Sequence, residues 1–256
     1  MILGLEFEPV SKLVQWKTLF GSGPLAPTRV TVQILLTVII VLAFYLIAGR
    51  KRKLVPTGVQ NLAESAVDFV QEGIILQSMG VEGLSWTPFM LTLFSFILVL
   101  NLWEVIPGFQ MPVTAHIAIP VELALLVWFL FNFVGIKSQG FFGYFKSMAF
   151  PPGVPKPLYV LITPIEIIST LFVRPLSLSV RLFANMLAGH LLLATFAVLS
   201  AAIFAADAIY LKPFFVLPFG LLIALTGFEV LVAFLQAFIF TILAAVYIGL
   251  AMHPEH

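Results

Sequence analysis

The sequence has 256 residues, of which 61% are hydrophobic and 10% are charged, and its formal net charge is +1. A soluble globular chain has roughly 45–50% apolar and about 25% charged residues, so this composition predicts an all-α polytopic membrane protein with a single membrane domain. The small net charge argues against a nucleic-acid partner. The absence of cysteine excludes disulfides and thiolate metal sites, and we expect no metal and no cofactor.

The N-terminal part of the chain sets the expected orientation in the membrane. Residues 1–28 mix charged and apolar residues and lack the pattern of a cleavable signal peptide, so we expect a short segment outside the membrane. A first span runs from Arg29 to Gly49 and is followed by four consecutive basic residues, Arg50 to Lys53. Because basic residues concentrate at the cytoplasmic edge of a membrane, this order predicts that the N-terminus lies outside.

Residues 56–79 predict an amphipathic helix that is too polar to span. Apolar residues recur at helical spacing on one face, and Glu64, Asp68 and Glu72 lie on the other. Such a helix lies on the cytoplasmic surface or against a partner. Since its polar face is acidic rather than basic, the sequence favours a protein contact over lipid.

Two shorter spans follow. Pro88 to Pro107 is expected to return outward, residues 108–119 to form an outer link, and Pro120 to Ile136 to cross back, with Glu122 near its start. A loop rich in glycine and proline then carries three lysines, which alternate with the spans as the positive-inside rule requires.

The last two helices are expected to be too long for an upright crossing. Residues 158–204 are apolar with few breaks, and at 1.5 Å per residue a straight helix of that length would reach about 70 Å, against a hydrocarbon core of about 30 Å. A final helix, Phe219 to Met252, is also over-length and ends in the cytoplasm. Residues 158–252 therefore predict a tilted, bent or broken hairpin along a curved partner surface.

This hairpin carries charges at membrane depth. Arg174, Arg181 and Asn185 fall on one side of a helix, together with small residues. A charge at the centre of a bilayer helix costs at least about 2.5–3.5 kcal/mol, so that side must face protein or water. Arg174 is close enough to a helix end to snorkel, but more than twenty mostly apolar residues follow Arg181.

Two motifs resemble a known family. Arg181-Leu-Phe-Ala-Asn-Met-Leu-Ala-Gly-His190 resembles the signature of subunit a of rotary F-type ATP synthases, and Glu229-Val-Leu-Val-Ala-Phe-Leu-Gln236 resembles its second motif. The segment Asn101 to Pro107 and the hydropathy extend the resemblance to most of the chain. It implies a stator subunit with two aqueous half-channels. The start of the chain resembles no transit peptide, which favours a bacterial plasma membrane over that of an organelle. The implied partners are a c-ring of hairpin subunits bearing an essential carboxylate, b-type subunits of a peripheral stalk, and the lipid bilayer.

The resemblance also implies roles for single residues. An arginine stays protonated, so Arg181 is expected to impose a fixed charge that makes a passing ring carboxylate release its proton. Gln236 is expected beside Arg181, where its carbonyl would hold the guanidinium. His190 and Glu229 are expected to pair in the outer half-channel, or to form a structural salt bridge. Three further polar residues are expected at the mouth of that half-channel: Asn101, Glu104 and His116.

Glu166 has two interpretations. Thr163-Pro164-Ile-Glu166 has the pattern of a capping box with proline at the first helical position. The family instead places a carboxylate near here, beside the cytoplasmic half-channel, fourteen residues before the central arginine. The interval in this sequence is fifteen, so Glu166 would be rotated by about 100° unless a π-bulge absorbed the extra residue. Arg174 still matches the family's basic position and is expected to act through cytoplasmic-side electrostatics.

Two other functions are compatible with parts of the pattern. A proton-coupled secondary transporter or pump subunit could use Arg181, Glu229 and His190 as a substrate or proton site, but no internal repeat is visible. A passive scaffold of a respiratory complex would explain the apolar bulk but not the charged stripe. In the main interpretation the chain performs no bond chemistry itself.

Overall fold

The computed structural model describes residues 28–50, 53–106, 113–150, 158–206 and 209–252. Several predicted features lie outside the described residues: nearly all of the expected outer segment at the N-terminus, Lys51, Arg52, Lys156 and the last four residues. The α-helices are α2 (Arg29–Arg50), α3 (Val59–Val70), α4 (Leu76–Ser78), α5 (Thr87–Leu102), α6 (Ala118–Gln139), α7 (Phe141–Ala149), α8 (Tyr159–Ile168), α9 (Arg174–Ala205) and α10 (Val216–Met252). Shorter π segments (Gln71–Ile75, Ser169–Val173) and 3-10 segments (Val81–Trp86, Val113–Ala115, Ile209–Phe215) join them.

The predicted all-α membrane fold is confirmed. Five helical stretches in the described part are long and apolar enough to cross a bilayer. Their bounds are Arg29–Arg50, Val81–Leu102, Ala118–Gln139, Tyr159–Ala205 and Lys212–Met252.

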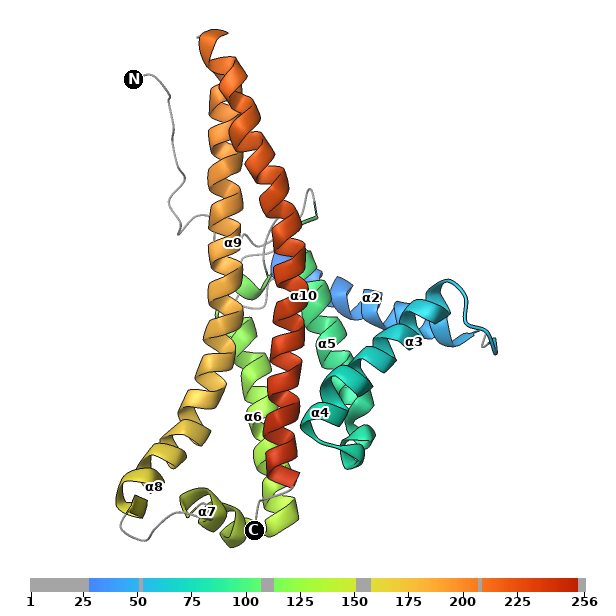
Figure 1. The fold of residues 1–256 in the computed structure, drawn as a ribbon, viewed down its shortest axis with the longest axis vertical. Helices are drawn as coiled ribbons and strands as arrows, with labels where there is room; N and C mark the ends of the chain where they lie inside the picture. The colour runs from blue at the N-terminus through green and yellow to red at the C-terminus, as the bar shows by residue number, and fades with distance from the viewer. Residues whose placement is uncertain (1–27, 51–52, 107–112, 151–157, 207–208, 253–256) are drawn as a thin grey trace.

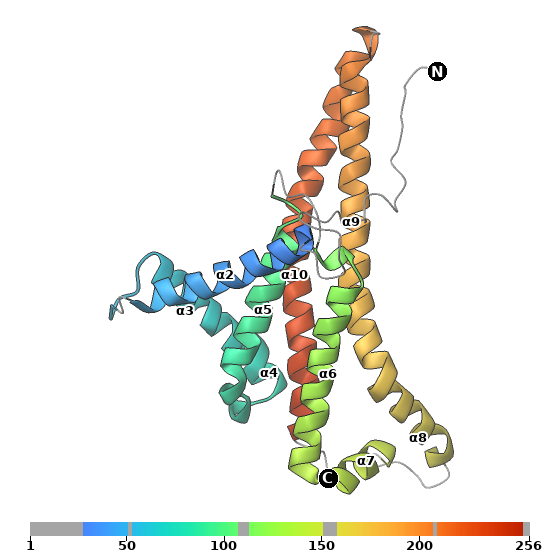
Figure 2. The same ribbon diagram turned by 180° about the vertical axis from the view of Figure 1, so that it is seen from behind.

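The last two stretches form the predicted long hairpin. In both ribbon views α9 and α10 run side by side along the length of the molecule, and their upper parts stand clear of the other helices (Figures 1 and 2). The Tyr159–Ala205 stretch has 47 residues, about 70 Å at 1.5 Å per residue, whereas α2 has 22 residues and spans about 33 Å. Since α2 runs across the direction of the hairpin, an upright α2 leaves the hairpin strongly tilted.

The core lies around the lower half of α10. This helix packs against α5, α6 and α9, and its buried stripe combines small and large side chains: Ala233, Ala237, Phe240, Ala244 and Ile248. In a membrane the hydrophobic effect does not drive helices together, and small side chains let their backbones approach closely enough to pack. The position of α10 is thereby fixed on three sides, and the position of its polar residues with it.

The predicted amphipathic helix is present as α3, the following π segment and α4. Its apolar side is buried at Ala63, Val70 and Ile74, and the three acidic side chains of the opposite face are exposed. Two apolar residues near the start of this helix, Val59 and Leu62, are exposed rather than buried.

One helix was not predicted. The glycine- and proline-rich stretch after the third span contains α7, which begins directly after α6. Gly140 separates the two helices with φ +76°, a left-handed conformation that glycine adopts without strain. The chain therefore reverses, and the Tyr144 hydroxyl of α7 donates a hydrogen bond to Asn132 Oδ1 of α6 at 2.9 Å.

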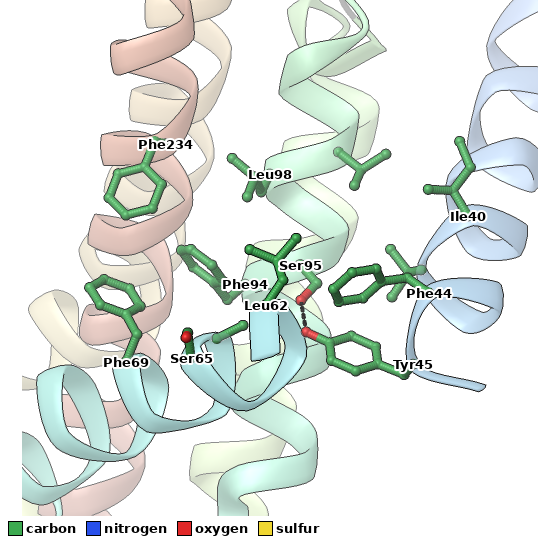
Figure 3. A pocket seen from close by; sticks show the side chains of 13 residues that line it. Ile40, Phe44, Tyr45, Leu62, Ser65, Phe69, Phe94, Ser95, Leu98 and Phe234 are labelled. Atoms are coloured by element: carbon green, nitrogen blue, oxygen red, sulfur yellow. Dashed lines mark hydrogen bonds between the residues drawn. The ribbon is translucent and has the colours of Figure 1, made fainter. Parts of the chain in front are cut away.

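An apolar groove of about 470 Å³ opens among α2, α3, α5 and α10. Figure 3 shows aromatic and aliphatic side chains around it, including Phe44, Phe69 and Phe234. Its polar contact is a hydrogen bond of 2.7 Å between the hydroxyls of Tyr45 and Ser95. The described lining carries no charged side chain.

Candidate functional site

Arg181 lies near the middle of the long helix that α8 and α9 form. It is 22 residues beyond Tyr159 and 24 residues before Ala205, the ends of the apolar stretch. Its neighbours Leu178, Leu182 and Met186 are buried against the rest of the chain, whereas Arg181 is exposed. No residue in the described part gives its guanidinium a hydrogen bond or an ion pair. A permanent charge therefore projects from the protein at membrane depth.

A hollow runs along the α9–α10 pair next to Arg181. It has a volume of about 470 Å³ and is lined from α9 by Asn185 and Gly189 and from α10 by Glu229 and Gln236, among other residues. Unlike the apolar groove in Figure 3, it contains a carboxylate and two amides. It can therefore hold water, because polar groups are available to bind it.

Asn185 and Gln236 connect the two helices within this hollow. Asn185 Nδ2 donates a hydrogen bond to Gln236 Oε1 at 2.8 Å. The Gln236 side chain is buried, and its Nε2 has no hydrogen-bond partner among the described residues. The expected contact between the Gln236 carbonyl and the Arg181 guanidinium is not among the hydrogen bonds of the described residues, and this oxygen accepts from Asn185, one turn beyond Arg181.

Glu229 is buried opposite a glycine of α9. A Cβ atom placed on Gly189 would lie 2.5 Å from Glu229 Oε1 and 2.6 Å from Oε2. The carboxylate thus occupies the space that the missing side chain leaves. Gly189 belongs to the first motif and permits this close approach. The sequence analysis did not identify this role of Gly189.

His190 has a different partner from the predicted one. Its Nδ1 lies 3.9 Å from Glu104 Oε1, and Glu104 follows α5 rather than lying on α10. Burial, and then the charge of Glu229, raises the pKa of Glu104 to about 8. The expected His190–Glu229 pair is therefore corrected to a cluster in which His190 contacts Glu104 while Glu229 acts on Glu104 through its charge.

The other two outer residues lie in the same region of the chain. Asn101 is buried, accepts a hydrogen bond of 3.0 Å from the Thr114 hydroxyl, and donates one of 3.5 Å to the carbonyl of Ala233. His116 follows Thr114 by two residues and is half-buried, and burial lowers its pKa to about 4. Thr114 was not predicted, because a threonine in an apolar link carries no signal by itself.

Glu166 does not cap a helix. The helix α8 begins at Tyr159, so Pro164 lies inside it rather than at its first position, and the Thr163 hydroxyl donates to the carbonyl of Ala149. Instead, Arg174 Nη2 lies 3.1 Å from Glu166 Oε1. The π segment Ser169–Val173 separates the two residues, so the structure contains a π segment where the second interpretation of Glu166 expects a π-bulge.

The described residues contain no group of three or more histidine, cysteine, aspartate or glutamate side chains that could hold a metal ion. The site consists of a free arginine flanked by carboxylates, amides and a histidine. These groups can bind and pass protons and water, and none of them is arranged as a nucleophile with a base.

The fold and the site thus define a polytopic membrane protein that has an arginine near the middle of its longest apolar stretch and a helix pair lined by polar side chains. Comparison with known proteins agrees: the model of the family described as "ATP synthase A chain" matches residues 30–249. The chain belongs to this ATP synthase A chain family.

Curated relatives cover most of the chain. It is 45% identical to the ATP synthase subunit a of Frankia alni over 241 residues, 92% of this chain and 81% of the relative. The corresponding protein of Rhodococcus erythropolis is 43% identical over 98% of this chain and 89% of its own length. That of Hyphomonas neptunium is 41% identical over 98% of each chain. These relatives do not favour a secondary transporter.

Proposed function

We propose that this chain is the stator subunit of a proton-translocating F-type ATP synthase and that Arg181 is its central fixed charge. The observation that carries the proposal is the exposed, unpaired Arg181 at the middle of a 47-residue apolar stretch. A charge in that place costs several kcal/mol if it meets lipid. It is stabilised if a carboxylate of a neighbouring subunit lies against it.

The partner is then a ring of hairpin subunits, each with a carboxylate at the depth of Arg181. The guanidinium keeps its proton under physiological conditions, so it cannot relay protons. It favours the ionised form of a carboxylate close to it. A ring carboxylate must therefore release its proton before it passes Arg181 and take up another afterwards. The positive charge of Arg181 also repels a hydrated proton.

The outer path is assigned to the cluster beyond Arg181. Glu104, His190 and Glu229 come from three elements, and Asn101 with Thr114 adds hydrogen-bonding groups beside them. His190 lies nine residues beyond Arg181, about 13 Å along the helix. His116 belongs to the same mouth. During synthesis, protons enter here and reach the ring through the hollow that contains Asn185 and Gln236.

The inner path is assigned to the region of Glu166 and Arg174, which lies on the other side of Arg181 along the same helix. The orientation follows from the basic residues: Arg50, Lys53, Lys137 and Lys146 lie on the cytoplasmic side and Lys212 outside. The chain would work in a bacterial plasma membrane beside b-type subunits. One proton crossing 100 mV yields about 2.3 kcal/mol, so each ATP requires several protons.

The experiment is proton-driven ATP synthesis in membrane vesicles that contain the complete complex. Arg181→Ala and Arg181→Gln are expected to abolish it while the complex still assembles, and Lys146→Ala, a change to a basic residue outside the spans, serves as the matched control. Synthesis that continues at the control rate without Arg181 would contradict the proposal.

A further inference from the structure

The π segment Ser169–Val173 determines which residues of the long helix share a face. Glu166 and Arg174 are eight residues apart, and in a regular α-helix eight steps of about 100° leave the two side chains about 80° apart. A single π turn takes up one extra residue, so the flanking helices are related as if seven residues separated them. The difference then falls to about 20°. The ion pair of 3.1 Å agrees with the second case.

The same face continues to Arg181. Arg174 and Arg181 are seven residues apart within regular α-helix, which places them about 20° apart around the axis. With the π turn, Glu166, Arg174 and Arg181 therefore lie along one side of the helix. Without it, Glu166 would be turned away from that side by the extra residue.

Arg174 is also held from the second helix of the hairpin. Its guanidinium carbon lies 5.2 Å from the centroid of the Tyr247 ring of α10, within the range of a cation–π contact. Thr170, a buried residue of the π segment, has its hydroxyl 3.5 Å from Glu166 Oε1. The carboxylate is thus contacted by the π segment and by Arg174, and Arg174 by α10.

We propose that Arg174 is a positioning residue for proton exit. The π segment and Tyr247 hold Arg174 against Glu166, and this contact keeps the Glu166 carboxylate on the same side of the helix as Arg181. This inference rests on the proposed function. In it, Glu166 accepts the proton that leaves the ring and passes it to water on the inner side. Arg174 keeps its own protons throughout, since a guanidinium is not deprotonated in proteins.

Two changes of chain length test the role of the π segment. Deleting Phe172, an exposed residue of that segment, should convert the π turn to α-helix and leave Glu166 facing Arg174. Proton-driven ATP synthesis is then expected to stay within about twofold of the unaltered complex. Inserting an alanine after Phe172 should rotate Glu166 by about 100° and lower synthesis at least about tenfold. A deletion variant that is lost or inactive like the insertion would overturn the role of the π segment.

Substitutions test Arg174 itself. After removal of the soluble catalytic sector, passive proton flow through vesicles is measured while the pH is varied on one side at a time. Arg174 Nη2 lies 3.1 Å from Glu166 Oε1, so its removal takes away a contact that holds this carboxylate in place. Arg174→Gln should therefore change the dependence of flow on inner-side pH and leave the outer-side profile as it was. Tyr247→Leu should reproduce this change in part, and Tyr247→Phe, which keeps the ring, should restore the profile.

The outcomes separate this inference from the proposed function. If Arg181→Ala abolishes synthesis but Arg174→Gln and Tyr247→Leu leave the inner-side profile unchanged, the positioning role is wrong and the proposed function stands. If Arg174→Gln changes the inner-side and outer-side pH profiles equally, Arg174 acts on the whole subunit rather than on proton exit. This result also overturns the inference.

Discussion

At the scale of single residues, the site depends on side chains whose positions would change if their neighbours were substituted. Glu229 is the clearest case, because it occupies the space above Gly189. Gly189→Ala would force the carboxylate to move, and because this is the end of a flexible side chain, we expect the change to alter the position of Glu229 more than the stability of the fold. We expect assembled complex with ATP synthesis reduced at least about tenfold, measured in vesicles. Gly220→Ala is the control, since a Cβ there meets nothing within 4 Å. Equal activity of the two variants would contradict the contact.

The raised pKa of Glu104 gives a pH prediction. The pKa of the Glu104 carboxyl is about 8 in the folded protein, whereas the ordinary pKa of a glutamate is 4.5. Because the folded state binds more protons than the unfolded state between these values, the contribution of Glu104 to the free energy of unfolding falls as the pH rises between them. Glu104→Gln mimics the protonated form and should flatten the dependence.

The measurement is the thermal unfolding midpoint of the purified membrane sector over that pH range. Glu122→Gln, a change to an exposed carboxyl of α6, is the control. Curves for Glu104→Gln that run parallel to those of the unaltered protein would contradict the buried, protonated Glu104.

The hydrogen bond between Asn185 and Gln236 should appear as a coupling energy. In a double-mutant cycle of Asn185→Ala and Gln236→Leu, followed by thermal unfolding, we expect an interaction of about 1 kcal/mol. The cycle of Asn185→Ala with Thr241→Val should be additive, because the Thr241 hydroxyl bonds to the Ala237 carbonyl of its own helix. Additivity in both cycles would show that the bond is not made.

At the scale of elements, the sequence predicted where helices are but not how they face one another. Apolar length identified all five spans, and charges within them pointed to Arg181, His190 and Glu229 as candidate site residues. The partner of His190 was wrong because the contact joins α9 to the end of α5, and no spacing within either helix encodes it. The local pattern at Thr163–Glu166 suggested a cap, but tertiary packing continues the helix through Pro164. Phe141–Ala149 was missed because its glycines indicated a loop.

At the scale of the whole molecule, the fold places the polar hollow along the α9–α10 pair and the apolar groove among α2, α3, α5 and α10. The α9–α10 hairpin carries the site, and α9 lies at the edge of the molecule in both views (Figures 1 and 2). The helices α2 and α3 extend to the opposite side, where the groove of Figure 3 is apolar. This separation leaves the exposed face of Arg181 available to a partner.

The orientation can be tested in the same chain, which has no cysteine of its own. Single cysteines at Lys146 and Lys212 should react from opposite sides with a membrane-impermeant maleimide, the first from the cytoplasmic side and the second from outside. Reaction of both from one side would contradict the five crossings.

The most direct test of the central claim is cysteine cross-linking between α9 and the carboxylate-bearing helix of the ring. Cysteines on the side of Arg181, at Ala184 and Ala188, are exposed, whereas those at Leu182 and Met186 would be buried within this chain. We predict disulfide cross-links to the ring from the first pair and not from the second. Cross-links from Leu182 or Met186, or none from Ala184 and Ala188 in an assembled complex, would show that Arg181 does not face a rotor.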